Sequence, residues 1–470
     1  MKNKFVKPFF GLVLILTMLF SPVSPGTGRI SQDMVSVNQL NAFLQASVKP
    51  VSAFADGTSS GLEKLVLNIV LLDQKISQGE AGDEFGGAVA ISGDTAVVGA
   101  GNHQVGSHLF QGAACVYVRS GSTWQLQQQL TAPDGATQDY FGRAVAISGD
   151  TVVIGSYGST VDFSDQGAAY VFQRTGTTWE LQQKLIDASE TQESDRFGNS
   201  VAIDGDTILV GEFLDDVGLN SGQGSVLVFT RTGETWSEQS RFTSNDGLAG
   251  DRFGQNVALS GDTALIGLPY ASIGENFEQG SAYIFVRNGT SWTQQAKLTA
   301  SDGSMGDNFG MSIALSGDTA IIGASSDDVS DAWNQGSAYL FIRSGSTWSE
   351  EAHLFASDGA ANDRFGVSVA LWGDKALIGA ILDVVNDHMT GSAYLFTKEL
   401  SGWIEQDKLL AVDGAGGDEF GKAVALSNST AMVGAWRDVV NGDFPEGSVY
   451  IHELSVPYSL HLPLVIRSSP

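Results

Sequence analysis

The chain has 470 residues, including 57 glycines and a single cysteine, and its 53 acidic side chains outnumber the 25 basic ones. The formal charge of −28 repels the phosphates of nucleic acids and anionic lipid surfaces, so we expect no nucleic-acid partner. The lone Cys115 cannot form an intramolecular disulfide, and its strand-like surroundings at residues 113–117 predict a small buried hydrophobic residue.

The N-terminus carries the pattern of an export signal. Three lysines precede an apolar run over residues 9–20, and a Pro/Ser/Gly-rich stretch follows it. Because this run is too short to span a bilayer comfortably, it predicts a signal peptide over residues 1–24 and a linker over residues 25–61. The protein is then secreted or held at the cell surface, without membrane insertion after the signal is removed. An uncleaved anchor is the alternative, and the small-residue pattern at residues 53–55 leaves the cleavage point open.

A Phe-Gly pair recurs along the rest of the chain at intervals of 55 or 56 residues, and an aspartate stands two residues before each pair. Repetition at a fixed period indicates stacked units that cannot bury their apolar faces alone. The seven copies therefore predict seven structural units. The phenylalanines are Phe85, Phe141, Phe197, Phe253, Phe309, Phe365 and Phe420, and the aspartates are Asp83, Asp139, Asp195, Asp251, Asp307, Asp363 and Asp418.

Each unit contains four segments in constant order. The first is a short apolar strand such as residues 145–147, which ends at a Gly-Asp turn suited to a tight hairpin. The second is a continuous apolar run such as residues 320–323, and the third follows a variable loop, as at residues 336–341. The fourth begins near a tryptophan such as Trp124 and is polar, which suits an exposed edge. The pattern predicts an all-β fold over residues 62–455, a seven-bladed β-propeller of four-stranded antiparallel blades with strands ordered from axis to rim.

Closure of the ring depends on which end of the chain supplies the last strand. The apolar run at residues 65–72 precedes the first Phe-Gly pair and could complete the seventh blade from the N-terminal side. The C-terminal residues 456–470 form either a tail or a competing closing strand, because residues 459–466 are also mostly apolar. We expect the N-terminal strand to close the ring.

The repeat resembles a known family. Its Asp-x-Phe-Gly motif, the apolar strand and a Gly-Ala or Gly-x-Pro step, as at residues 99–100 and 267–269, are similar to the FG-GAP repeats of integrin α-subunit propellers. Bacterial FG-GAP proteins with Trp-x-x-x-x-x-Leu and Ser-Asp-Gly segments are more similar still. The resemblance implies ligand contacts on the face formed by the loops from second to third and from fourth to first strands.

Integrin propellers also bind Ca²⁺, through an Asp-x-Asp-x-Asp-Gly loop in the hairpin between the first and second strands. In this chain that hairpin is a short Ser-Gly-Asp-Thr turn, as at residues 316–319. Such a turn cannot supply the roughly six to eight oxygen ligands that Ca²⁺ prefers. We therefore expect integrin-type calcium sites to be absent.

Two recurrent acids are further candidates for a metal site. The aspartate before each Phe-Gly pair most simply caps its own turn by accepting hydrogen bonds from backbone amides, with a ligand role as the alternative. A second acid stands five residues earlier, and the two carboxylates could share a Ca²⁺ ion, although an Asp-Gly turn also explains most of these acids. We predict no cofactor, with Ca²⁺ as the alternative. The second acids are Asp134, Glu190, Asp246, Asp302, Asp358 and Asp413.

The variable loops between second and third strands are the best candidates for a binding site. Features shared by every blade most simply serve the fold, whereas features that differ are free to serve function. Aromatic and acidic side chains together are typical of recognition surfaces, although the rings could equally cover loop backbone. We expect an extracellular, non-catalytic binding or adhesion module that recognises a protein or glycan. Its candidate residues are Tyr157, Phe213, Asp215, Asp216, Tyr270, Phe277, Asp327, Asp328, Trp333, Asp383, Trp436 and Asp438.

Enzyme signatures are missing from the sequence. The six histidines lack metal-binding spacing, and there is neither a Gly-x-Ser-x-Gly elbow nor a phosphate-binding glycine loop. We therefore predict no catalytic residue and no metal ligand. Because carboxylates are abundant, a secreted propeller glycosidase working from carboxylates at the axis is the alternative.

Overall fold

The computed structural model describes residues 71–161, 164–188, 194–440, 442 and 444–454. The chain divides into two units, residues 1–67 and 68–470, and only the second contains described residues. The predicted signal peptide, linker and C-terminal tail therefore lie outside the described residues.

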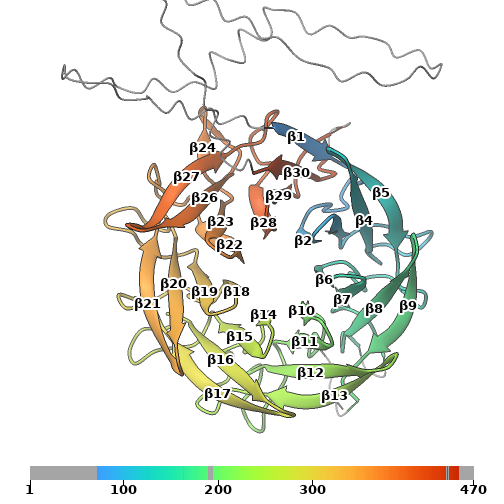
Figure 1. Cartoon of the computed structure of the whole chain (residues 1–470), viewed down its shortest axis with the longest axis horizontal. Helices are drawn as coiled ribbons and strands as arrows, with labels where there is room; N and C mark the ends of the chain where they lie inside the picture. Colours follow the sequence, from blue (N-terminus) through green and yellow to red (C-terminus); the bar gives the residue numbers. More distant parts are fainter. Residues whose placement is uncertain (1–70, 162–163, 189–193, 441, 443, 455–470) are drawn as a thin grey trace, which may run out of the picture. The chain divides into compact units, whose positions relative to one another are not determined.

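The described chain forms seven four-stranded antiparallel sheets, arranged as a ring of blades (Figure 1). No α-helix occurs in this part of the chain. Blade one is β2 (Ala88–Ser92), β3 (Thr95–Ala100), β4 (Ala113–Ser120) and β5 (Thr123–Leu130). Blade two is β6 (Ala144–Ser148), β7 (Thr151–Ser156), β8 (Ala168–Thr175) and β9 (Thr178–Leu185). Blade three is β10 (Ser200–Asp204), β11 (Thr207–Glu212), β12 (Ser225–Thr232) and β13 (Thr235–Phe242).

The remaining blades repeat this order, and blade six carries an additional short hairpin. Blade four is β14 (Asn256–Ser260), β15 (Thr263–Leu268), β16 (Ser281–Asn288) and β17 (Ser291–Leu298). Blade five is β18 (Ser312–Ser316), β19 (Thr319–Ala324), β20 (Ser337–Ser344) and β21 (Thr347–Leu354). Blade six is β22 (Phe365–Trp372), β23 (Lys375–Ala380), β26 (Ser392–Glu399) and β27 (Gly402–Leu409), with the hairpin β24 (Val384–Val385) and β25 (His388–Met389). Blade seven is β28 (Phe420–Leu426), β29 (Thr430–Ala435), β30 (Ser448–Glu453) and β1 (Leu71–Ile76).

The predicted fold and the order of strands from axis to rim are confirmed. The first strand of each blade faces the axis and the fourth lies at the rim (Figure 1). Second strands such as β3 are buried along their length, apart from the first residue of β19 and of β23, which explains their continuous apolar sequence. Fourth strands such as β5 are mostly exposed or half-buried, with only Trp124 and Leu130 buried, as expected for an edge strand.

The strand that closes the ring comes from the N-terminal side. β1 pairs antiparallel with β30, with Leu71 opposite Glu453 and Ile76 opposite Val449. The direction of closure is confirmed, but the strand begins near the end of the predicted run at residues 65–72 and continues to Ile76. Residues 65–70 lie outside the described part of the chain.

A side-chain amide joins the closing strand to blade one. Gln74 donates through Nε2 to the Trp124 carbonyl at 2.9 Å and accepts from the Trp124 amide at 2.7 Å. The same two-way bond connects Gln128 with Trp179 in the next pair of blades. β1 is therefore bonded to both of its neighbours in the ring.

The Phe-Gly motif holds adjacent blades together. All seven phenylalanines are at most 1% exposed, and several pack edge-on against a tyrosine of the third strand, as Phe309 does on Tyr339 with ring centroids 5.4 Å apart. The glycine before each third strand lets the backbones meet: a Cβ on Gly280, whose φ is +87°, would lie 2.1 Å from the Phe309 carbonyl oxygen. No other residue fits at this crossing.

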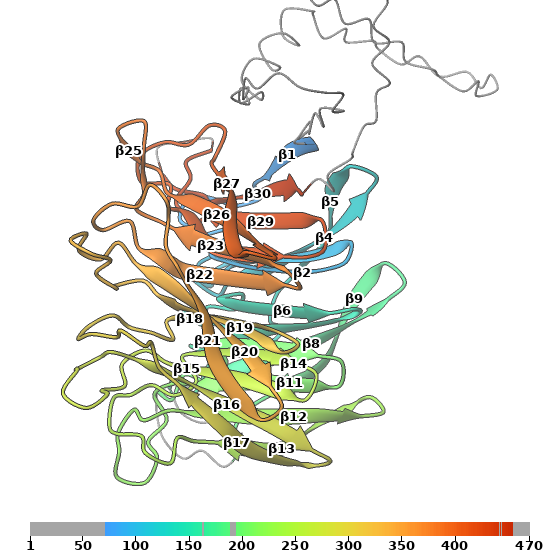
Figure 2. The same ribbon diagram turned by 60° about the vertical axis from the view of Figure 1, so that its left-hand side comes forward.

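The connections between strands emerge on two opposite faces (Figure 2). We call the side with the loops from second to third and from fourth to first strands the loop face. The other side carries the tight turns within each blade and is called the hairpin face. The β24–β25 hairpin belongs to the loop face.

Candidate binding face

Exposed apolar side chains concentrate on the loop face. Of the nineteen large hydrophobic residues described as exposed, fourteen lie in its loops and five elsewhere. Because exposed apolar side chains that lie together mark contact sites for other molecules, the loop face is the better candidate of the two faces. The fourteen are Leu109, Phe110, Leu219, Leu248, Phe277, Met305, Trp333, Phe355, Val384, Met389, Leu410, Val412, Val439 and Phe444.

The predicted aromatic residues divide into two groups. Phe277 and Trp333 are 70% and 66% exposed, as a contact role requires. Tyr157, Phe213, Tyr270 and Trp436 are half-buried, and each has a cation over its ring. The shortest of these contacts place the Arg252 guanidinium carbon 4.3 Å from the Tyr270 centroid and Lys422 Nζ 4.7 Å from the Trp436 centroid. Each of these rings is therefore stacked with a cation instead of being freely exposed.

Four of the predicted acids are buried, so the expectation that they are exposed is wrong. Asp215, Asp327, Asp383 and Asp438 are 2–8% exposed. Each has hydrogen-bond or ion-pair partners within its own blade. Asp383, for instance, accepts a hydrogen bond from the Tyr394 hydroxyl at 3.2 Å and lies 2.6 Å from Lys408 Nζ.

The other two predicted acids reach the surface. Asp328 is exposed and Asp216 is half-buried. Their carboxylates accept hydrogen bonds from the backbone amides of Asn334 at 2.7 Å and Gly222 at 2.8 Å, respectively. Both acids therefore shape their own loops while keeping some contact with solvent.

The second acids of the repeat tie neighbouring blades together. Asp358 accepts a hydrogen bond from the Tyr394 hydroxyl at 2.8 Å and pairs with Lys408 at 2.8 Å. Burial alone would raise the pKa of Asp358, but these bonds outweigh it and lower the pKa. The same tyrosine contact recurs at Asp134, Asp246, Asp302 and Asp413.

The aspartates before Phe-Gly cap turns, as predicted. Asp139 accepts the amide of Ala136 at 2.8 Å, and Asp307 accepts that of Ser304 at 2.5 Å. Burial raises the pKa of Asp307 to about 6. The described residues contain no group of three or more His, Cys, Asp or Glu side chains placed to hold a metal ion.

Blade one departs from the repeat in a coordinated way. Cys115 occupies the position of the hydroxyl-bearing tyrosine, and Gln78 occupies that of its acid partner. His103 replaces the buried loop aspartate and contacts Asp83 at 2.8 Å, and this hydrogen bond raises the pKa of His103. Cys115 is 4% exposed, and burial raises the pKa of its thiol to about 12, so the prediction of a buried hydrophobic residue is confirmed.

Sequence reasoning missed a set of cations beside the Phe-Gly pairs. These side chains occupy the residue before the phenylalanine or the residue after the glycine, where the repeat has no fixed identity. The same rule that selected the variable loops, that differences between blades can serve function, would have found them. They are Arg143, Arg196, Arg252, Arg364 and Lys422, and Arg437, the second residue of the second-to-third loop of blade seven, belongs with them.

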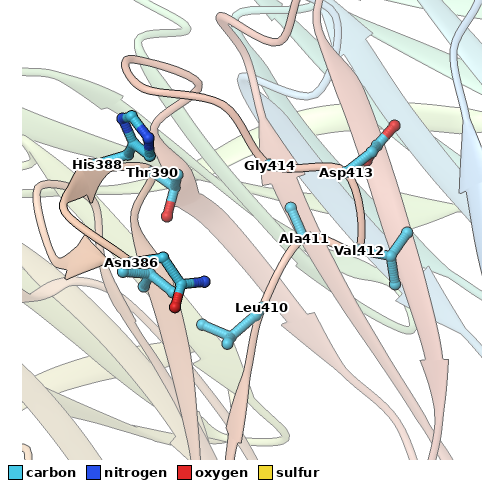
Figure 3. A pocket seen from close by; sticks show the side chains of 9 residues that line it. Asn386, His388, Thr390, Leu410, Ala411, Val412, Asp413 and Gly414 are labelled. Carbon is cyan, nitrogen blue, oxygen red and sulfur yellow. The ribbon is translucent and has the colours of Figure 1, made fainter.

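A pocket of about 360 Å³ lies between blades six and seven on the loop face. Its walls come from the β24–β25 hairpin, including His388, and from residues 410–414 of the loop that leads to blade seven (Figure 3). Blades one, three, four and five have a single antiparallel bridge at the same loop position, as between Val329 and Ala332, and blade six extends it to two paired positions.

Comparison with known families agrees with this geometry. A model described as FG-GAP repeat matches seven segments, residues 76–117, 124–172, 179–229, 236–285, 292–341, 348–396 and 403–452. The chain belongs to the FG-GAP repeat family. Each match to this family ends in the third strand of a blade, so the seven matches correspond to the seven blades. A comparison with curated proteins gives no match.

Proposed function

We propose that this FG-GAP propeller is an extracellular, non-catalytic module that binds a protein or glycan with its loop face. The observation that carries the proposal is the concentration of exposed apolar side chains on that face, with fourteen of the nineteen described. FG-GAP repeats are typical of extracellular proteins, which supports export. None of the described residues forms a helix long and apolar enough to cross a membrane.

The described residues give less support to a hydrolase function. Glycosidases use two carboxylates roughly 5–9.5 Å apart that flank one glycosidic bond. The carboxylates beside the Phe-Gly pairs, Glu84 and Glu419, instead pair with Arg143 at 2.9 Å and Arg437 at 3.1 Å. Both acids therefore have cationic partners already.

Two tryptophans on opposite faces allow a matched test. Trp333 on the loop face is 66% exposed, and Trp372 at a turn of the hairpin face is 42% exposed. The protein is first screened against a display library of random peptides and a glycan array. The affinity of each selected ligand is then measured for two variants: the loop-face double variant Trp333→Ala with Phe277→Ala, and the hairpin-face variant Trp372→Ala. Exposed aromatic anchors contribute about 2 kcal/mol or more to an interface, so the loop-face variant should bind at least about tenfold more weakly.

The Trp372→Ala variant should bind as the wild type does. Ligands that are lost in this variant and kept in the loop-face variant would assign binding to the hairpin face and contradict the proposal. The absence of any ligand from both libraries would contradict it as well.

A further inference from the structure

The cations of the described chain fall into two sets. Twelve of the eighteen form ion pairs in or beside the strands, for example Arg287 with Asp262 at 2.6 Å and Lys408 with Asp383 at 2.6 Å. The other six lie at the axial end of the loop face, beside the Phe-Gly pairs or at the start of a second-to-third loop, and we call them the mouth cations; three of them also pair with a carboxylate. They are Arg143, Arg196, Arg252, Arg364, Lys422 and Arg437.

Three mouth cations sit where the backbone disfavours a long side chain. Arg196, Arg252 and Arg364 precede their phenylalanines with φ values of 65°, 58° and 60°. This left-handed conformation costs an ordinary residue about 1–2 kcal/mol, and glycine or asparagine adopts it more easily, as Asn308 does in blade five. Arginine at these positions is therefore not explained by the needs of the turn.

Trp436 gathers the other three mouth cations around one ring. Lys422 Nζ lies 4.7 Å from its centroid, and the guanidinium carbons of Arg437 and Arg143 lie at 5.3 and 5.8 Å. The indole Nε1 donates to Glu419 at 2.7 Å. Contacts of this kind occur about once in 70–80 residues, so three on one ring mark a concentrated positive charge.

Two glycines of blade one lie beside this cluster. Arg143 belongs to blade two but reaches Trp436 in blade seven. Arg143 lies beside Gly101, where an added Cβ would be 3.5 Å from the Arg143 Cα. Trp436 lies beside Gly87, where an added Cβ would be 4.0 Å from the indole ring. Arg143 and Trp436 thus pass these two glycines of blade one at ordinary van der Waals distances.

The charge of the cluster is not balanced. Glu84 pairs with Arg143 and Glu419 pairs with Arg437, which leaves Lys422 with no carboxylate within 4.0 Å among the described residues. Burial lowers the pKa of Lys422, and the neighbouring Arg143 lowers it further. An anion placed here would meet the Lys422 ammonium group and two guanidinium groups that already pair with Glu84 and Glu419.

The surface around the cluster indicates which kind of partner molecule would bear the anionic group. A polyanion would be repelled by a protein with a net charge of −28, so a single charged group on a neutral or cationic partner fits better. Nine of the fourteen exposed apolar side chains on the loop face are aliphatic, which suits apolar peptide side chains better than sugar rings. We propose that Lys422, Arg143 and Arg437 bind one carboxylate of a polypeptide partner, either an acidic side chain or a free C-terminus. The proposal rests on loop-face binding as proposed above.

A thermal-shift experiment tests the cluster without a partner. The probes are glutarate and inorganic phosphate at roughly 50 mM, with ionic strength held constant by NaCl. Because a ligand of the folded state raises the melting temperature, glutarate should shift the wild type by about 1–2 °C. Lys422→Met should lose the shift and Lys422→Arg should keep it. No shift in the wild type, or an equal shift in Lys422→Met, would overturn the site; a larger shift with phosphate would overturn its preference for carboxylate.

The peptide and glycan libraries separate this inference from loop-face binding itself. Selected peptides should carry an Asp, a Glu or a free C-terminus, and conversion to the amide should weaken binding at least about tenfold. Peptides that need Trp333 but neither the carboxylate nor Lys422 would overturn the inference and leave the proposed function standing. Ligands found only among glycans would overturn the assignment to a polypeptide.

Discussion

Lys75 Nζ in the closing strand lies 2.6 Å from the carboxylate of Asp438 and 2.7 Å from that of Asp413. One side chain thus joins β1 to the second-to-third loop of blade seven and to the loop that leads there from blade six. Hydrogen bonds and the charges of both aspartates raise the pKa of Lys75, although burial acts in the opposite direction and is the largest single influence.

Lys75→Ala should destabilise the propeller by about 2–3 kcal/mol, because it leaves the buried Asp438 without its cation. Chemical denaturation followed by tryptophan fluorescence measures this loss. Lys375→Ala is the control, since Lys375 pairs only with the exposed Asp374 and should lose less than about 1 kcal/mol. Equal losses in both variants would show that the contacts of Lys75 do not secure the ring.

The tyrosine bonds between blades should be measurable as a coupling energy. Tyr394→Phe, Asp358→Asn and the double variant form a cycle around a hydrogen bond of 2.8 Å, and we expect a coupling of about 1 kcal/mol. Tyr394→Phe combined with Asp302→Asn is the control, because Asp302 is bonded to Tyr339 instead, at 2.8 Å. If the stability losses of Tyr394→Phe and Asp358→Asn simply add up in the double variant, this hydrogen bond does not contribute to blade packing.

Stability should depend on pH through Asp307, whose pKa burial raises from 3.8 to about 6. Since the folded state holds this proton more tightly than the unfolded chain, the stabilisation is complete below about pH 4 and is lost as the pH rises through about 6. Asp307→Asn should therefore gain stability relative to the wild type between pH 4 and 7. Urea denaturation of both proteins at each end of this range measures the difference, and a constant difference would contradict the burial effect.

Cys115 should be inert in the folded protein because it is buried and its thiol pKa is raised to about 12. Reaction with a chromogenic disulfide at pH 8 should be about 100-fold slower in buffer than in denaturing urea. In urea the titration should give one thiol per chain. Rapid modification without denaturant would mean that blade one opens readily.

Two glycines separate backbone conformation from crowding. Gly280 and Gly289 have φ values of +87° and +64°, but only Gly280 has backbone atoms in the path of a Cβ. Gly289→Ala should lower the free energy of unfolding by about 1–2 kcal/mol, because only the left-handed backbone conformation disfavours the side chain there. Gly280→Ala should cost clearly more, because it also separates Phe309 from the preceding blade. Similar melting temperatures for the two variants would refute the close crossing.

The repeat made the fold predictable, whereas the position of the closing strand needed a different signal. Apolar character selected residues 65–72, but an outer strand is polar, and its register follows the Gln-x-Lys-Leu pattern seen at residues 182–185 and 406–409. Residues 73–76 read Asp-Gln-Lys-Ile and share with that pattern a lysine followed by an aliphatic residue, so Lys75 takes the place of Lys184 and Lys408 in other blades. Comparing outer strands would have placed β1 correctly.

The candidate site was predictable as a face but not residue by residue. Asp383 is adjacent to variable, exposed positions in sequence, yet Lys408 and Tyr394 approach it from two other strands and bury it. Such contacts between strands leave no local trace in composition. Arg143 was missed because it directly follows the invariant Phe-Gly pair, outside the variable loops, and its partner Trp436 belongs to another blade.

Closure by β1 also sets how the propeller responds to mechanical load. Leu71, the first residue of β1, pairs with Glu453, the last residue of β30, so both ends of this strand pair lie together on the hairpin face. Traction between these two residues would break the interstrand hydrogen bonds one after another, as a zipper opens, instead of shearing them all at once. Tension between the two ends should therefore release blade seven at low force, whereas attachment through one end leaves the ring unloaded.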